Sequence, residues 1–114
     1  MNFSMSYKVI PTEYLKQQVL ELKKNYPNIR RDLKELSGIL KLNPKSGKSL
    51  GKKVYKIRLK SSDISKGKRG GYRIITYVID EQEIVRILTI YAKPRKANIS
   101  DKEIMSILQE EEII

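Results

Sequence analysis

The sequence contains no cysteine and no histidine, and each absence removes a class of site. Without cysteine there is no disulfide framework and no thiolate metal site. Without histidine the chain lacks the most common general base and the most common metal ligand. No apolar run approaches the roughly 18 residues that span a bilayer, and the N-terminus lacks the apolar core of a signal peptide. We therefore expect a cytoplasmic protein without membrane contact.

Positive charge is what the chain has in abundance. Its 114 residues carry 24 Lys and Arg against 13 Asp and Glu, a net charge of +11. Between Lys45 and Arg73 there are eleven Lys and Arg and a single acid, Asp63. A basic segment of this kind indicates a polyanion partner, whereas the alternative is a lysine-rich surface that keeps the protein soluble. At this length we expect a single domain over residues 1–114 with one hydrophobic core.

The first part of the chain predicts a short strand and two amphipathic helices. Residues 7–10 suit a strand, and Thr12 is placed to cap a helix that Pro11 and Glu13 also favour. Apolar residues recur at helical spacing: Leu15, Val19, Leu22 and Tyr26 in the first helix, and Ile29, Leu33, Leu36 and Leu40 in the second. Charged residues of the second helix, including Asp32, are expected on its other faces. The pattern predicts a helical hairpin lying on a sheet.

Residues 44–49 contain Gly-Lys-Ser, which suggests a phosphate-binding P-loop. We reject that interpretation because the motif needs a glycine five residues before Gly47, where this chain has Leu42. The motif also needs a following helix, whereas the next residues alternate like a strand. We therefore predict a flexible basic loop at 44–49.

The second part of the chain predicts three strands and a last helix. Residues 54–60 alternate, with Tyr55, Ile57 and Leu59 on one face and Lys56, Arg58 and Lys60 on the other. Residues 72–79 and 84–92 are rich in β-branched and aromatic side chains and read as a hairpin of central strands. Ser100 and Glu103 form a capping box that opens the last helix, and glutamates 110–112 oppose its dipole, so we expect it to be short and easily displaced. The predicted class is α+β, with a small, mainly antiparallel sheet packed against an N-terminal helical hairpin, and a short C-terminal helix.

The hairpin register decides whether the cations meet. If Arg73 shares a face with Ile75 and Tyr77, its hairpin neighbours include Thr89, Tyr91 and Lys93. Arg73, Tyr91 and Lys93 then approach the strand face that carries Lys56 and Arg58, whereas a register slip of one residue reverses this arrangement. The basic loop before Arg73 and the segment after Lys93 add further cations. We expect these to contact RNA phosphates: Lys60, Lys66, Lys68, Arg69, Arg95 and Lys96.

A cluster of this composition has the groups needed to cleave RNA. Attack by the RNA's own 2′-hydroxyl needs a base, charge stabilisation at phosphorus, and an acid for the leaving 5′-oxygen. Arginine stays charged and binds phosphate through two hydrogen bonds, which assigns Arg58 and Arg73 to the phosphate. Lysine and tyrosine have reference pKa values of about 10.4 and 10, and crowded cations favour loss of their protons. Lys56, Lys93 or Tyr91 would then move the proton, and no metal or other cofactor is needed. The residues alone favour binding over catalysis, because many basic strands bind RNA without cutting it.

Three segments resemble the RelE/HigB toxins of bacterial type II toxin–antitoxin systems. They are Tyr-Lys-Ile-Arg-Leu at 55–59, Gly-Lys-Arg-Gly-Gly-Tyr-Arg-Ile-Ile-Thr-Tyr at 67–77, and Ile-Leu-Thr-Ile-Tyr-Ala-Lys at 87–93. The resemblance implies a ribosome-dependent endoribonuclease, an mRNA interferase that enters the ribosomal A site and cuts mRNA there without a metal. It also implies a cognate antitoxin that neutralises the toxin, with operator DNA bound only through the antitoxin complex.

The resemblance also implies roles for particular residues. Lys56 and Arg58 match the family's basic pair on the first long strand, and Arg73 matches its arginine after Gly-Tyr. Lys93 falls where RelE proper has a catalytic arginine. The tyrosine that RelE has shortly afterwards aligns with Ile99 here, which leaves Tyr91 as a substitute candidate.

Two other functions compete with the nuclease. ParE toxins share this fold and inhibit DNA gyrase without being nucleases, so fold alone does not separate the two. A non-catalytic RNA-binding module is expected to offer aromatic stacking surfaces, and this chain has one Phe and no Trp. The basic strand face together with Arg73 and Lys93 favours the nuclease over both.

Overall fold

The fold is a sheet with helices on both faces. The computed structural model describes residues 6–64, 71–93 and 98–114. Its elements are, in order, β1 (Lys8–Pro11), α1 (Glu13–Leu22), α2 (Ile29–Leu42), β2 (Lys48–Gly51), β3 (Val54–Leu59), β4 (Tyr72–Ile79), the 3-10 turn η1 (Asp80–Gln82), β5 (Ile84–Ala92) and α3 (Asp101–Glu110). The strand order is β1-β5-β4-β3-β2, with β1 parallel to β5 and all other pairs antiparallel. The predicted α+β class with a mainly antiparallel sheet is confirmed.

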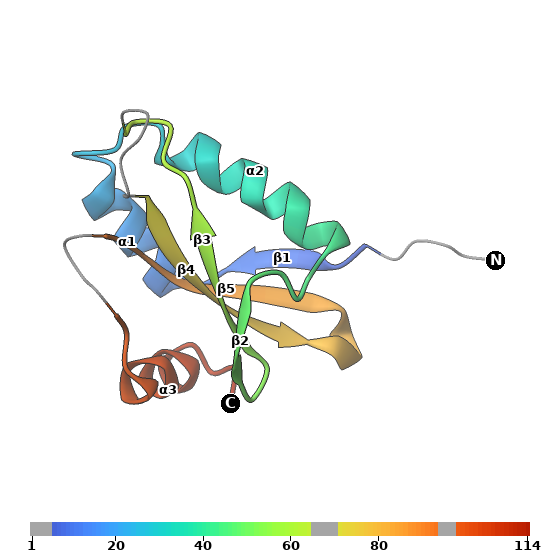
Figure 1. Ribbon diagram of the computed structural model, residues 1–114. Coiled ribbons are helices and arrows are strands. Elements are labelled where there is room, and N and C mark those ends of the chain that lie inside the picture. The colour runs from blue at the N-terminus through green and yellow to red at the C-terminus, as the bar shows by residue number, and fades with distance from the viewer. Residues whose placement is uncertain (1–5, 65–70, 94–97) are drawn as a thin grey trace.

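Figure 1 shows α1 and α2 on one face of the sheet and α3 against the other. The larger apolar core lies under α1 and α2, where the expected apolar residues of both helices are buried except Leu33, which is partly buried, and Tyr26, which lies beyond the end of α1 and is also partly buried. A smaller cluster joins α3 to the sheet, with Ile104 and Ile107 packed against Ile75 and Leu88. The predicted capping box at Ser100 is present at the start of α3. None of the helices in the described ranges is long and apolar enough to cross a bilayer.

Thr12 connects the start of α1 to a bulge in β5. Its hydroxyl donates to the carbonyl oxygens of Ile87 at 3.0 Å and Leu88 at 2.9 Å, and it accepts the N–H of Leu15 at 3.0 Å. The register between β4 and β5 shifts at this point, which leaves Leu88 without a directly opposed residue. The predicted cap is therefore confirmed, and the same hydroxyl also stabilises the bulge.

Replacing Thr12 by valine should lower the free energy of unfolding by about 1–3 kcal/mol, because the N–H of Leu15 and the carbonyl of Leu88 lose the hydroxyl as a partner, whereas the carbonyl of Ile87 still accepts the backbone N–H of residue 12. Thr76→Val is the matched control. The Thr76 hydroxyl is buried and has no hydrogen-bond partner in the part of the chain that the structure describes, so its loss should be neutral or stabilising. Urea unfolding of both variants measures the difference, and equal destabilisation would contradict this account.

One predicted loop is wrong. Residues 48 and 49 belong to the edge strand β2, in which Lys48 pairs with Lys56 and Ser49 with Tyr55. The strand reads Lys-Ser-Leu-Gly and contains no β-branched or aromatic residue, so its own composition does not predict it. Hydrogen bonding to β3 forms it instead.

A second correction concerns α2. Asp32 is 5% exposed rather than on an outer face. Its carboxylate accepts the backbone N–H of Ser62 at 3.0 Å and the Ser62 hydroxyl at 3.2 Å. A short-range helical pattern cannot predict a partner that lies on the loop after β3.

The C-terminal end of α3 is bound to the start of α1. The Glu111 carboxylate accepts the N–H groups of Glu13 at 3.1 Å and Tyr14 at 2.9 Å. Amides in the first turn of a helix have no partner within the helix and lie at the positive end of its dipole. The negative charge of Glu111, which is unfavourable at the C-terminal end of α3, is thus stabilised by the N-terminal end of α1. The easy displacement of α3 stays a prediction.

Candidate active site

The sheet places Arg58, Arg73 and Tyr91 in one row across β3, β4 and β5. Arg58 is paired with Arg73, and Arg73 with Tyr91. Directly opposed residues share a face of the sheet, with β-carbons about 5 Å apart. The row lies on the face that α3 covers in part, because Ile75 packs against α3 and alternates with Arg73 on the same face. The shared face assumed from the sequence is present, and the bulge at Leu88, which the sequence does not predict, sets Arg73 directly opposite Tyr91.

Lys56 and Lys93 lie on opposite sides of this row. Lys56 is one alternate position before it on β3, about 7 Å away along the strand, and its Nζ donates to Oδ1 of Asn98 at 3.2 Å. Lys93 is one alternate position after Tyr91, and its N–H donates to the carbonyl oxygen of Gly71 at 3.2 Å. All five residues that the sequence proposed for catalysis therefore meet on one face.

Gly71 brings the ends of three strands together at this place. Its φ is +98°, and a β-carbon there would lie 2.7 Å from the carbonyl oxygen of Leu59. Only glycine fits such a position, since it combines left-handed backbone with close approach of another main chain. Because Gly71 also accepts the N–H of Lys93, it links the end of β3 to the end of β5 beside the row of arginines.

Burial separates the candidate residues into two kinds. Arg58 is exposed, and Lys56 and Lys93 are half-buried. Arg73 and Tyr91 are only 6% and 7% exposed. The hydroxyl oxygen of Tyr91 is buried, and its ring packs in the cluster under α3. Tyr91 is thus placed to support α3, and the two lysines are the more accessible of the candidate proton carriers.

The guanidinium of Arg73 is a buried charge with little compensation from the described residues. Its Nη1 donates to the carbonyl oxygen of Tyr72 at 3.3 Å. It forms no ion pair within residues 6–64, 71–93 and 98–114. A buried charge is costly unless it is paired. An anion bound between Arg73 and the exposed Arg58 would supply the missing counter-charge.

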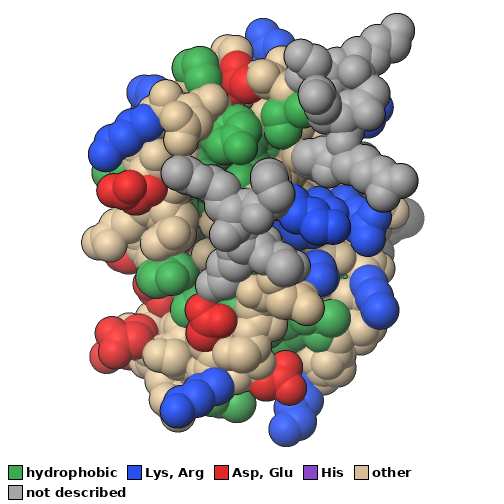
Figure 2. Space-filling view, turned by 60° about the vertical axis from the view of Figure 1, so that its left-hand side comes forward, with side chains coloured by type: hydrophobic (Ala, Val, Ile, Leu, Met, Phe, Trp, Pro, Cys, Tyr) green, Lys and Arg blue, Asp and Glu red, His purple; other side chains and the backbone are tan. Residues whose placement is uncertain are grey.

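Acidic side chains neutralise other parts of the basic segment. Lys45 is 3.0 Å from Asp80, and Lys53 is 3.7 Å from Glu81, both acids lying in the turn between β4 and β5. Hydrogen bonds from Lys45 and Tyr7 hold the pKa of Asp80 below its usual value. In the described part of the chain no such partner reaches Lys56, Arg58, Arg73 or Lys93. Figure 2 shows Lys and Arg side chains gathered at the right of that view.

The loop after β3 is bound to the start of α2. Asp63, the acid of the basic segment, accepts the backbone N–H of Asn28 at 2.9 Å and its side-chain amide at 2.7 Å. The Ser61 hydroxyl donates to the Tyr72 hydroxyl at 3.1 Å, and burial raises the pKa of Tyr72 to about 12. These contacts fix residues 61–64, and with them the end of β3 where Lys60 is exposed.

Several expected RNA contacts lie outside the described residues: Lys66, Lys68, Arg69, Arg95 and Lys96. The structure adds two residues that the sequence analysis missed. Lys48 stands opposite Lys56 on the edge strand, in a segment predicted as a loop. Asn98 accepts the hydrogen bond of Lys56, and no local pattern points to it. Within the described ranges, no group of acidic side chains converges in a way that could hold a metal ion.

Comparison with known proteins identifies the fold. No model of a protein family matches the chain. A free-state structure of E. coli toxin RelE, a mutant with two arginines changed to alanine, aligns with 96% of this chain and 97% of its own at 24% identity and a TM-score of 0.55. The chain has the RelE fold. The isolated E. coli RelE toxin likewise aligns with 92% of this chain and 99% of its own, at 24% identity and a TM-score of 0.53. The RelE fold expected from the sequence is therefore confirmed.

Proposed function

We propose that this chain is the toxin of a type II toxin–antitoxin system and that it cuts mRNA on the ribosome. The observation that carries the proposal is the meeting of Lys56, Arg58, Arg73 and Lys93 on one sheet face, without acidic partners among the described residues. Such a face attracts a polyanion and supplies both fixed charges and exchangeable protons. The likeness to RelE supports the same assignment.

The proposed reaction uses the RNA's own 2′-hydroxyl. Its oxygen attacks the adjacent phosphorus, the bond from phosphorus to the 5′-oxygen breaks, and a 2′,3′-cyclic phosphate and a free 5′-hydroxyl are formed. Arg58 and Arg73 stabilise the negative charge that builds up on the non-bridging oxygens. Both guanidiniums lie in one row, so a single phosphate between them contacts both.

Two protons must move in this reaction, one from the 2′-hydroxyl and one to the 5′-oxygen. Attacking and leaving oxygens lie on opposite sides of phosphorus in an in-line displacement. Lys56 and Lys93 lie on opposite sides of the arginine row, so one can serve each oxygen. One lysine takes the proton from the 2′-hydroxyl and the other gives a proton to the 5′-oxygen, so the pair carries the same number of protons before and after the reaction.

We expect the partners of such a toxin to be the ribosomal A site with its mRNA, and a cognate antitoxin protein that neutralises the toxin. Operator DNA would be bound only through the toxin–antitoxin complex. The high positive charge of the central segment suits the ribosome, whose RNA presents a dense array of phosphates.

Mapping of mRNA 5′ ends after induction of the isolated chain in cells tests the proposal. We expect new ends inside translated reading frames, and we expect them to vanish when translation initiation is blocked. Growth arrest with intact mRNA and altered DNA topology would assign the chain to the gyrase inhibitors instead. Normal growth with intact mRNA would indicate an RNA-binding module without catalysis.

A further inference from the structure

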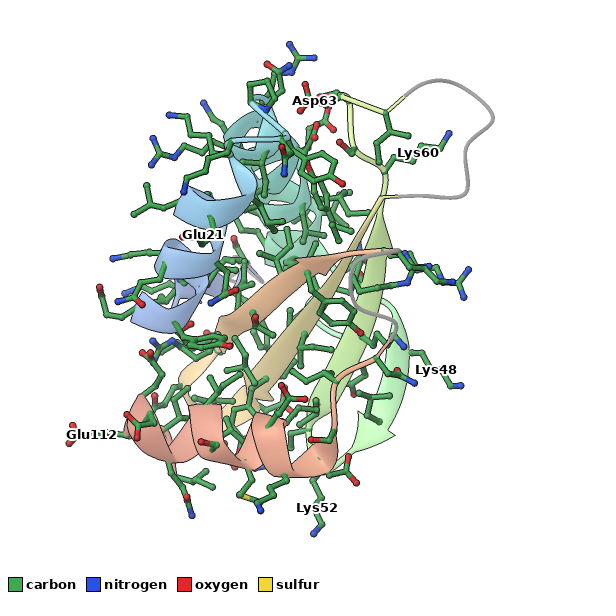
Figure 3. All side chains as sticks on the ribbon, turned by 90° about the vertical axis from the view of Figure 1, so that its left-hand side faces the viewer. Glu21, Lys48, Lys52, Lys60, Asp63 and Glu112 are labelled. Atoms are coloured by element: carbon green, nitrogen blue, oxygen red, sulfur yellow. The ribbon has the colours of Figure 1, made fainter. Side chains whose placement is uncertain are left out.

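A second pair of opposed cations lies beside the arginine row, at the edge of the sheet. Lys48 of β2 is the cross-strand neighbour of Lys56 on β3. In the next row along β3, Arg58 faces Arg73 of β4. Four cations therefore occupy two successive rows over three strands of one face. Figure 3 shows the side chains of Lys48 and Lys60 pointing outward on the same side of the molecule.

This arrangement is unfavourable for the free protein. Like charges directly opposite each other destabilise a sheet, and here two such pairs follow one another. Two other lysines of the basic segment, Lys45 and Lys53, form ion pairs with acids of the β4–β5 turn. Among the described residues, no acid forms an ion pair with Lys48 or Lys56. A lysine that only protects an edge strand from aggregation has no need to face another cation.

We propose that Lys48, beside Lys56, binds the RNA phosphate next to the scissile one, while Arg58 and Arg73 bind the scissile phosphate. The two rows are about 7 Å apart along β3, and an extended nucleic-acid strand places successive phosphates at a comparable spacing. The identity of the scissile phosphate rests on the proposed function, but recognition of two successive phosphates does not require cleavage. Lys48 is then a substrate-positioning residue, and the preferred ligand is a single strand longer than a dinucleotide.

Binding of non-cleavable 2′-O-methyl oligoribonucleotides tests this assignment. A dinucleotide supplies a single phosphate, and a trinucleotide supplies its neighbour as well. In Lys48→Gln, affinity for the trinucleotide should fall about fivefold, and the slope of log affinity against log salt should decrease by about 0.7. Affinity for the dinucleotide should not change. Lys34→Gln removes the same charge from an exposed site on α2, across the sheet, and should alter neither ligand.

Lys48→Glu separates binding from a structural role. The new carboxylate faces Lys56, so the melting temperature should rise or hold, while affinity for the trinucleotide falls further than in Lys48→Gln. The inference is overturned if Lys48→Gln weakens both ligands equally or neither, or if weaker binding in Lys48→Glu comes with a lower melting temperature. Failure of the proposed function would appear as intact mRNA in cells, a result independent of these affinities.

Discussion

Replacement of Arg73 by methionine is expected to slow mRNA cleavage by about 10²- to 10³-fold and to leave the protein at least as stable as before. Arg73 is 6% exposed and donates to one backbone carbonyl, so the native state carries a charge that the described residues do not neutralise. Exchange of a buried charged group for an apolar side chain of similar volume is often neutral, or stabilising by about 1–4 kcal/mol. If Arg73 served only the fold, its replacement by methionine would lower the free energy of unfolding.

The same change removes a donor aimed at the charge that develops on the phosphate. Loss of one such donor typically lowers the rate of the chemical step by about 10²- to 10³-fold. Single-turnover cleavage of mRNA on programmed ribosomes measures the rate, and thermal or urea unfolding measures stability. A folded Arg73→Met variant that cleaves at the parental rate would remove Arg73 from the site.

Arg86→Met is the matched control for this experiment. Arg86 lies on β5 of the same hairpin, and its Nε donates to the carbonyl oxygen of Ile10 at 3.2 Å, away from the arginine row. The Arg86→Met variant loses the same charge and gains the same side chain as Arg73→Met, but the change lies outside the site, so cleavage should remain at the parental rate. Equal loss of activity in both variants would indicate that net charge affects ribosome binding in general, and would argue against a specific phosphate-binding role of Arg73.

The central hairpin could be predicted from the sequence because its signal is local. Residues 72–79 and 84–92 are mostly β-branched or aromatic, and the polar turn between them is short, so the hairpin itself is predictable. The turn register alone would place Arg73 opposite Ile90, and the bulge at Leu88 shifts the pairing by one residue so that Arg73 stands opposite Tyr91. No local pattern predicts that bulge. The helices were predictable for a similar reason, since each buries one stripe of residues at helical spacing.

The remaining features depend on contacts between distant segments. β2 has no strand-forming residues of its own, so the sequence predicts a loop at Lys48 and does not predict its position opposite Lys56. Asp32 is buried because its partner Ser62 lies 30 residues further along the chain. The sequence position of Tyr91 favours a role in proton transfer, but in the structure its ring packs in the apolar cluster under α3. No periodicity along the chain encodes which side chains a later helix will cover.

Lys56→Arg is expected to cost nearly as much activity as Lys56→Met. Arginine keeps the positive charge and the reach toward phosphate, but it does not release its proton in proteins. If Lys56 carries a proton, both variants should slow the chemical step by about 10²- to 10⁴-fold. If Lys56 only attracts phosphate, Lys56→Arg should stay close to the parental rate while Lys56→Met does not.

The pH dependence of single-turnover cleavage distinguishes these cases further, because removal of a proton carrier removes one limb of the rate profile.

Asn98→Ala deletes the acceptor that holds Nζ of Lys56 at 3.2 Å, and it should slow cleavage less than Lys56→Arg, since the lysine remains able to transfer its proton. Tyr91→Phe should retain most of the parental rate, because the phenolic oxygen is buried beneath α3 rather than open to RNA. A parental rate in Lys56→Arg together with a large loss in Tyr91→Phe would assign proton transfer to Tyr91 instead of Lys56. That result would also require α3 to move before the substrate reaches the site.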